Sequence, residues 1–406
     1  MAGVTALALV MSLRYGAAIA MLGLIGGFAT PTLIHGEPNT PLLFGYLYLV
    51  FGGLAVLIRR QNWWGMSIPA TAVAFLWVVV WLFSGMDSGD GIWLSLFLMG
   101  VCATVVSSTR GAHEDDAGLE LPSAFRYIAL GGAAVLMGCV VYTTHFRALE
   151  WDMFGLFCVA GIVLAWFDHR TYGFVPWVAM GTNIVMILAW DAPNPTMLAL
   201  AIGSFGVLFS ASGILLQARS DKSLLWAGLT AAASLAYYLL GYFELRYSPL
   251  FIDISMFWGL LALGLSAASL FMLHTLMRDV PDDHPQRQYL LAIYAALTTA
   301  FLSIGLTIEL KREFLSVAFA AEMLALAMIN TRFDIKALRY LVGVLACVFG
   351  LLLIPQILLL VQLTAYSLVE AQLHLQDNIP IVNWPLFQLG LPAVVFMGSS
   401  YLLSSE

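Results

Sequence analysis

Charged residues are scarce in this chain. Only 10% of its 406 residues are Asp, Glu, Lys or Arg, whereas 61% are hydrophobic, and the mean hydropathy is +0.90. A soluble globular chain carries about 25% charged residues. The composition therefore excludes a water-soluble fold and predicts a protein whose solvent is the lipid bilayer.

Cysteine is also scarce, and the motifs of nucleotide chemistry are missing. The four cysteines lie inside apolar runs without the paired spacing of a metal or redox site, so we interpret them as small buried hydrophobes and expect no disulfide and no metal site. No Walker loop, dinucleotide fingerprint, nucleophile elbow or kinase signature occurs. We therefore expect no cofactor. The cysteines are Cys102, Cys139, Cys158 and Cys347.

A cleavable leader is not evident at the start of the chain. Residues 1–11 are apolar but have neither a basic segment nor a small-residue cleavage site, which argues against a signal peptide. About a dozen residues are also too few to span a bilayer comfortably. We expect the chain to begin part-way through a helix.

Long apolar runs dominate what remains. They are near 20 residues long and do not alternate in polarity, and only helices or closed barrels satisfy their backbone hydrogen bonds in lipid. The prediction is an all-α, polytopic transmembrane helix bundle with about 14–15 segments in a single integral membrane domain, residues 1–406. The segments are residues 2–12, 17–34, 41–58, 66–84, 91–108, 127–144, 152–167, 172–190, 196–217, 223–242, 254–277, 289–308, 314–330, 337–361 and 386–403.

The spans from residue 41 onwards group into fours, which suggests internal repeats. Two hairpins resemble each other: each begins with a Phe-Gly pair, turns at a basic elbow and closes with Trp. An even number of spans per unit would give the repeats one common orientation. Chance similarity between apolar helices is the alternative. The predicted repeats are residues 41–144, 152–242 and 254–361, and the matching positions are Phe44-Gly45 with Phe154-Gly155, Arg59-Arg60 with Asp168-His169-Arg170, and Trp81 with Trp190.

Basic residues are divided unequally between the two sets of alternate loops. Short cytoplasmic loops carry the excess of Lys and Arg, so the richer side is predicted to be the cytoplasm. Thirteen of the seventeen basic residues fall on that side: Arg14, Arg59, Arg60, Arg110, Arg126, Arg170, Arg219, Lys222, Arg278, Arg287, Arg332, Lys336 and Arg339.

The opposite side is acidic. Arg147, Arg246, Lys311 and Arg312 are its only basic residues, against twelve carboxylates, which gives it a net charge of minus 8. This acidic outer face disfavours nucleic acid as a partner. The expected partners are the lipid bilayer and other proteins of the cell envelope.

Glu322 is the one carboxylate well inside a predicted span. It lies eight residues into residues 314–330, roughly 12 Å deep in a core of about 30 Å. An ionised carboxylate at this depth costs a large desolvation free energy. The side chain is therefore either protonated or faces a partner or a water-filled cavity. It is therefore a candidate proton, cation or substrate site, or else a neutral carboxyl bonded to a neighbouring helix. Asn183 and Gln356 are further intramembrane polar candidates.

Several groups on the acidic side are candidates for a metal or acid-base site at an outer rim. None has the spacing of a zinc signature, and solvated loop ends are the simpler interpretation. The same interpretation applies to His145, Glu150, His374 and Asp377. The outer-rim candidates are His35, Glu37, Asp87, Asp152 and Glu309.

Six motifs, in order along nearly the whole chain, resemble a family of predicted bacterial membrane proteins known as domain of unknown function 2339. The resemblance implies a many-span inner-membrane protein and supplies no catalytic residue. Pro385 and Gln388 depart from the family pattern. The motifs are Ser12-Leu13-Arg14-Tyr15-Gly16, residues 22–31, Leu43-Phe44-Gly45-Tyr46, residues 314–324 with Ala320-Ala321-Glu322, Asn383-Trp384-Pro385 and Gly390-Leu391-Pro392-Ala393.

Three functions fit these observations. The first is a non-enzymatic protein that moves or gates a small solute or envelope component, with Glu322 as its internal polar site. The second is an envelope enzyme that acts on a lipid-linked substrate with outer carboxylates such as Glu37, Asp87 or Asp152. The third is a scaffold for envelope proteins. Catalytic residues are not identified by the sequence.

Overall fold

The structure is a computed structural model that describes residues 17–33, 39–84, 89–109, 121–191, 193–218, 223–254, 256–281 and 286–309, with a few isolated positions beyond. It divides into two compact units, unit 1 at Met1–Ala201 and unit 2 at Ile202–Glu406.

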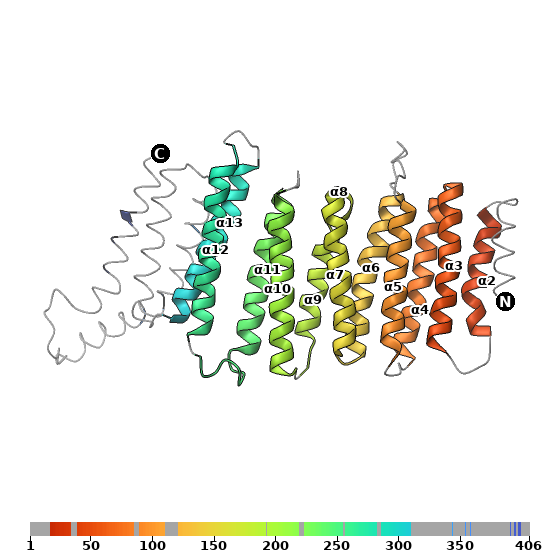
Figure 1. Ribbon diagram of the computed structural model, residues 1–406, viewed down its shortest axis with the longest axis horizontal. Helices are drawn as coiled ribbons and strands as arrows, with labels where there is room; N and C mark the ends of the chain where they lie inside the picture. The colour runs from red at the N-terminus through yellow and green to blue at the C-terminus, as the bar shows by residue number, and fades with distance from the viewer. Residues whose placement is uncertain are drawn as a thin grey trace. The chain divides into compact units, whose positions relative to one another are not determined.

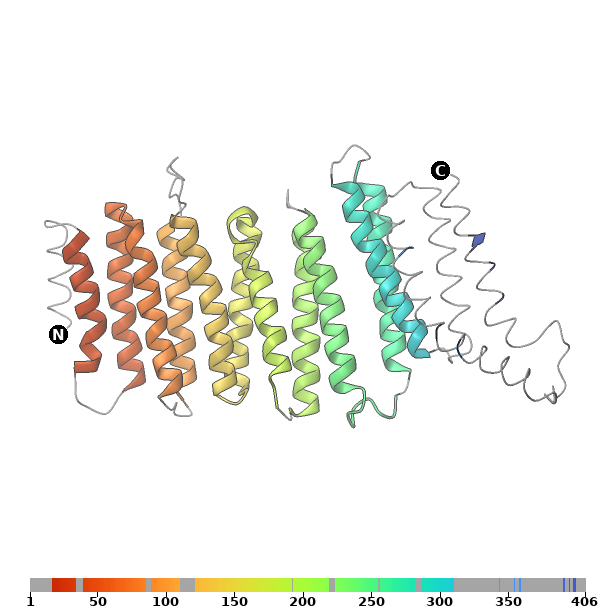
Figure 2. The same ribbon diagram turned by 180° about the vertical axis from the view of Figure 1, so that it is seen from behind.

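Unit 1 is built from helices that stand side by side, with their loops at two opposite ends (Figures 1 and 2). Helix α5 packs against α3 and α6, and α6 also contacts α4, α7 and α9. The elements are α2 (Ala17–Leu33), α3 (Thr40–Gln61), η1 (Trp64–Met66), α4 (Ser67–Phe83), α5 (Asp90–Thr109), α6 (Leu121–Thr143), α7 (Ala148–Phe167), α8 (His169–Tyr172) and α9 (Val175–Leu188).

The division between the units falls inside α10 (Pro195–Gln217), most of which belongs to unit 2. Unit 2 continues with α11 (Ser223–Leu245), α12 (Phe257–Asp279) and α13 (Arg287–Glu309). Helices α12 and α13 form an extensively packed antiparallel pair against which α11 lies. This division does not test the three repeats, which stay a prediction.

The all-α membrane fold is confirmed over the described part of the chain. Every span predicted from residue 17 to residue 308 corresponds to a helix, and ten helices of the described residues are long and apolar enough to cross a membrane. The predicted spans at residues 2–12 and 314–330 lie outside the described residues, and those at residues 337–361 and 386–403 are described only at isolated positions. Large apolar side chains such as Leu22, Leu49 and Leu76 are exposed, as expected where lipid is the solvent.

Local residue chemistry sets the helix ends. The Asn39 side chain accepts a hydrogen bond from the Leu42 backbone N–H at 3.3 Å, and Pro41 occupies the first turn of α3, where its missing N–H removes no helical bond. Asn62, at φ 54°, ends the same helix in the left-handed conformation. Arg59 and Arg60 therefore lie in the last helical turn, where positive charge is favourable.

The closing tryptophan of each similar hairpin of unit 1 packs against an aromatic ring, edge-on in the first hairpin and tilted in the second. Trp81 packs edge-on against Phe44 of α3, with ring centroids 5.9 Å apart. Trp190 lies 5.6 Å from Trp151 of α7. In both hairpins the tryptophan thus contacts an aromatic ring of the first helix, although this likeness alone does not establish a repeat.

Candidate functional site

The candidate residues of the sequence are only partly within the described chain. Asn183 lies in α9 and is fully buried, Asp152 is exposed in α7, and Glu309 is the last residue of α13. Asp152 and Glu309 belong to different units. Five candidates lie outside the described residues: His35, Glu37, Asp87, Glu322 and Gln356.

Glu150 is a buried carboxylate, and the prediction that it is a solvated loop end is wrong. It lies in the first turn of α7 with 2% of its surface exposed. Its Oε2 has no hydrogen-bond partner among the described residues. A Cβ atom at Gly91, in the first turn of α5, would lie 2.6 Å from Glu150 Oε1. The carboxylate is thus close to the positive ends of α5 and α7, which stabilise negative charge.

Glu309 in unit 2 has a similar relationship to a glycine. Its carboxylate packs over Gly259, in the first turn of α12, and leaves no room there for a Cβ. Within the described part of the chain, Glu309 Oε1 is buried without a hydrogen-bond partner. The Tyr238 hydroxyl donates to the Trp258 carbonyl at 2.9 Å, so aromatic residues enclose this end of α11 and α12.

Within each unit, aromatic rings gather at the end where the buried glutamate of that unit lies. In unit 1, Phe146 stacks on Trp190 with ring centroids 4.9 Å apart, and Trp151 joins them. In unit 2, the Arg246 guanidinium lies 5.1 Å from the centre of the Tyr242 ring. Trp151 and Trp258 are only 9% and 7% exposed. These tryptophans therefore pack inside their units rather than facing the headgroups as belt residues.

No set of three or more His, Cys, Asp or Glu side chains in the described ranges is arranged to hold a metal ion. The free cysteines of the same ranges differ in exposure. Cys102 and Cys158 are buried as predicted, whereas Cys139 is exposed on α6, so the prediction of a buried side chain is wrong there. Cys347 lies outside the described residues.

Unit 1 contains a pocket of about 400 Å³ between α5, α6, α7 and α9, which we call the apolar pocket. Helices α5 and α7 contribute residues three, four and seven positions apart, which is one face of each helix. Its lining residues are Met99, Cys102, Ala103, Val106, Ser107, Leu130, Phe157, Ala160, Gly161, Val163, Leu164 and Val175.

The apolar pocket has a buried floor and an exposed rim. Cys102, Leu130 and Phe157 are buried, whereas Ala103 and Ala160 are exposed. Because the exposed surface at this depth is apolar helix surface, the pocket opens towards lipid rather than towards water. This pocket was not predicted from the sequence, since no single run of residues encodes it.

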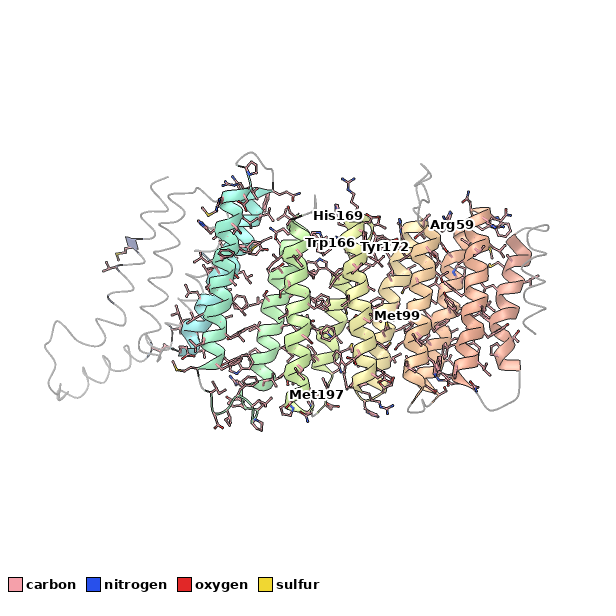
Figure 3. All side chains as sticks on the ribbon, in the orientation of Figure 1. Arg59, Met99, Trp166, His169, Tyr172 and Met197 are labelled. Carbon is pink, nitrogen blue, oxygen red and sulfur yellow. The ribbon has the colours of Figure 1, made fainter. Side chains whose placement is uncertain are left out.

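The pocket extends along α5 from the middle of unit 1 towards one end. From Met99 to Ser107 the helix rises about 12 Å, and Ser107 lies two residues before the end of α5. Figure 3 places Met99 near mid-height, Arg59 and His169 towards one end, and Met197 at the other. At the end of unit 1 that holds Arg59 and His169, helix α3 ends and helix α6 begins. The basic residues close to helix ends there are Arg59, Arg60, Arg126 and Arg170. We call this end of unit 1 the basic end.

Arg59 connects the basic end to the pocket. Its Nη1 donates a hydrogen bond to the Ser107 carbonyl oxygen at 2.9 Å. Ser107 itself lines the pocket. A guanidinium group is therefore held beside the end of a lipid-facing apolar hollow, which is the polarity pattern of an amphipathic ligand.

These features together define a polytopic, all-α integral membrane protein with a lipid-accessible pocket. Comparison with known proteins identifies the family. The chain belongs to the family described as predicted membrane protein, domain of unknown function 2339, whose model matches residues 1–406. No curated protein and no solved structure matches the chain.

Proposed function

We propose that this protein binds an amphipathic envelope component, a membrane lipid, and moves or positions it within the bilayer. The observation that carries the proposal is the apolar pocket of about 400 Å³, with its buried floor and exposed rim. Pockets of this size accommodate small ligands. An apolar pocket that faces lipid takes up a hydrocarbon chain more readily than a water-soluble solute, because the chain loses no hydration on entry.

The protein acts, in this proposal, in the bacterial inner membrane with the basic end of unit 1 in the cytoplasm. The excess of Arg and Lys in one set of short loops supports this orientation. The pocket extends towards the basic end, away from Glu150 and Asp152. Its position therefore favours lipid handling over the alternative of an enzyme acting at acidic outer carboxylates. Scaffolding of envelope proteins is the remaining alternative.

The test is to fill the pocket. Ala103 and Ala160 line its exposed rim from α5 and α7, so the double variant Ala103→Leu/Ala160→Leu occupies the space without changing charge. The full chain, purified with native lipid and placed in vesicles, is photo-crosslinked to a phospholipid with a reactive group in its acyl chain. We expect crosslinks on α5 and α7 in the wild type and their loss in the double variant.

A matched control is Ala72→Leu, an exposed alanine on α4 that does not line the pocket, and its crosslinks should equal those of the wild type. Movement is measured in the same vesicles as the rate at which a headgroup-labelled fluorescent phospholipid becomes accessible to an external quencher. The double variant should be slower than Ala72→Leu. Equal crosslinking in all three proteins would overturn the proposal.

A further inference from the structure

We infer that the apolar pocket is a site for a single acyl chain. It takes one hydrocarbon chain of a lipid from the leaflet at the basic end, with the methyl end inwards, and Met99 limits how far that chain reaches. This inference rests on the proposed function and adds to it the bound part of the lipid, its leaflet and a residue that sets chain length. The depth, the capacity and the lining of the pocket support it.

The pocket occupies one half of the length of the helices that line it. On α5 its residues run from Met99, the tenth of 20 residues, to Ser107. On α7 they run from Phe157, also the tenth of 20 residues, to Leu164. These stretches rise about 12 Å and about 10 Å, whereas one leaflet is about half of a 30 Å hydrocarbon core. Met99 lies near mid-height in Figure 3, so the pocket has the depth of one leaflet.

The volume of the pocket matches one acyl chain. An apolar cavity of about 150 Å³ holds one benzene molecule. In proportion, a pocket of about 400 Å³ holds about 16 carbon atoms. Two phospholipid chains of this length do not fit together in that space. One chain therefore enters the pocket, while the other stays in the surrounding bilayer.

The polar side chains of the lining, Ser107 and Cys102, are already bonded to backbone carbonyl groups. The Ser107 hydroxyl donates to the Thr104 carbonyl oxygen at 2.9 Å. The Cys102 thiol donates to the Ala129 carbonyl oxygen at 3.9 Å. A polar group brought into such an apolar environment is unfavourable unless it finds a hydrogen-bond partner. The bound part of the lipid is therefore plain hydrocarbon rather than a quinone ring or a hydroxylated chain.

The two ends of the pocket determine the orientation of the chain. Ser107 lies two residues before the end of α5, at the level where the lipid headgroups begin. Met99 and Phe157 lie at mid-height, where the methyl ends of the lipid chains meet at the centre of the hydrocarbon core. A lipid of the leaflet at the basic end therefore enters sideways through the exposed rim, and its chain keeps the direction that it has in the bilayer.

Met99 is positioned to limit the length of the chain. Its side chain is half-buried at the inner end of the pocket, and Phe157 reaches the same depth from α7 with only 4% of its surface exposed. A methionine side chain is long and unbranched, so its size determines the space at this end. A larger residue at position 99 should shorten the pocket, and a smaller one should lengthen it.

The test uses the full chain in vesicles with two photoreactive phosphatidylcholines that have chains of about 16 carbon atoms. One lipid carries its diazirine next to the ester and the other at the terminal methyl end. Crosslinks are mapped on buried Phe157 and on Leu156, which is 50% exposed and does not line the pocket. We expect the terminal label on Phe157 and the ester-side label on Val175, which is 1% exposed. Leu156 reports lipids outside the pocket.

Met99→Trp fills the inner end, so it should abolish crosslinks of the terminal label to Phe157 and leave those to Leu156 unchanged. Leu96→Trp is the matched control, at an exposed position of α5 outside the pocket, and should change neither. Equal crosslinking of Phe157 in the two variants would overturn the role of Met99. Met99→Ala is the second variant if Met99→Trp folds poorly, and it should raise the crosslinking of a longer chain to Phe157.

The remaining outcomes separate this inference from the proposed function. A terminal label on Val175 with an ester-side label on Phe157 would assign the lipid to the opposite leaflet. Two crosslinks in one pocket, from a lipid labelled in both chains, would contradict a single-chain site. Either result overturns the inference and leaves the proposed function standing. Absence of crosslinks to Phe157 in the wild type, or their persistence in Ala103→Leu/Ala160→Leu, overturns both.

Discussion

The carboxylate of Glu150 lies against the α-carbon of Gly91, so that a Cβ atom added there would be 2.6 Å from Oε1 and 2.9 Å from Cγ of the glutamate. Two helices that begin at the same end of unit 1, α5 and α7, are thereby brought into contact at their first turns. The contact requires glycine on α5, because only a residue without a side chain leaves room there for the buried carboxylate of α7. Substitution of the glycine tests it directly.

Gly91→Ala should destabilise the protein by about 1–3 kcal/mol, because the buried Glu150 side chain must move to admit the methyl group. The measurement is the thermal unfolding midpoint of the purified chain in detergent. Gly89→Ala, two residues earlier and with open space around it, should change stability by less than about 0.5 kcal/mol. If Gly91→Ala costs the same in a Glu150→Ala background, the contact is not the cause.

Gly213 is a second position where a helix crossing requires glycine. A Cβ there would lie 2.8 Å from the Trp226 carbonyl oxygen and 3.0 Å from the Thr230 backbone nitrogen, both on α11. Backbone atoms cannot rotate away, so Gly213→Ala should force α10 and α11 apart and cost at least about 2 kcal/mol. The same unfolding assay measures the loss.

Gly203 is the matched control for this crossing. It lies on α10 as well, but no atom is within 4 Å of a Cβ placed there. Gly203→Ala should therefore stabilise the protein by about 0.5–1 kcal/mol through helix propensity alone. Similar losses from both substitutions would show that the effect is not the approach of α11.

The positions of the helices could be predicted from the sequence, because apolar runs bounded by charge, Pro or Gly determine where a chain crosses lipid. Their ends were less predictable. Helix α3 continues past residue 58 to Gln61, since Arg59 and Arg60 are good helix formers and Asn62 supplies the left-handed cap. Helix α6 begins at Leu121 rather than near residue 127, because a single basic residue, Arg126, does not interrupt a helix.

The candidate site was less predictable than the fold. Glu150 was grouped with solvated loop residues because it lies just before the predicted span at residues 152–167, and in the structure it is buried against Gly91 of α5. The apolar pocket depends on four helices, and on the small Gly161 opposite Val175. Such tertiary complementarity leaves no periodic signal in one sequence. Glu322, the strongest candidate of the sequence, lies outside the described residues.

The turn after α6 is a position where a substitution should improve stability. His145 and Phe146 both have left-handed backbones, with φ 55° and 56°, a conformation that costs a non-glycine residue about 1–2 kcal/mol. Phe146 also stacks on Trp190, whereas His145 is exposed. His145→Gly should therefore stabilise the protein by about 0.5–1 kcal/mol, after allowing for the extra flexibility of glycine when unfolded.

The control for this turn is Thr143→Gly, in the last turn of α6, where a helical backbone gives glycine no advantage. It should destabilise by about 0.5–1 kcal/mol. Thermal unfolding of both variants gives opposite signs if backbone conformation is the cause. A loss of stability in His145→Gly would instead assign that side chain a stabilising role.

Arg60 and His145 lie at opposite ends of unit 1, because α3 ends where α6 begins and α6 then crosses to the other end. Both side chains are exposed. A cysteine introduced at either position can therefore be labelled to report on which side of the membrane it lies. If basic loops stay in the cytoplasm, a membrane-impermeant maleimide should label His145→Cys in intact spheroplasts and Arg60→Cys only after permeabilisation.

The native chain, whose cysteines all lie in apolar runs, gives the background. The reverse pattern would invert the proposed orientation, and labelling of both variants without permeabilisation would contradict a membrane crossing between them.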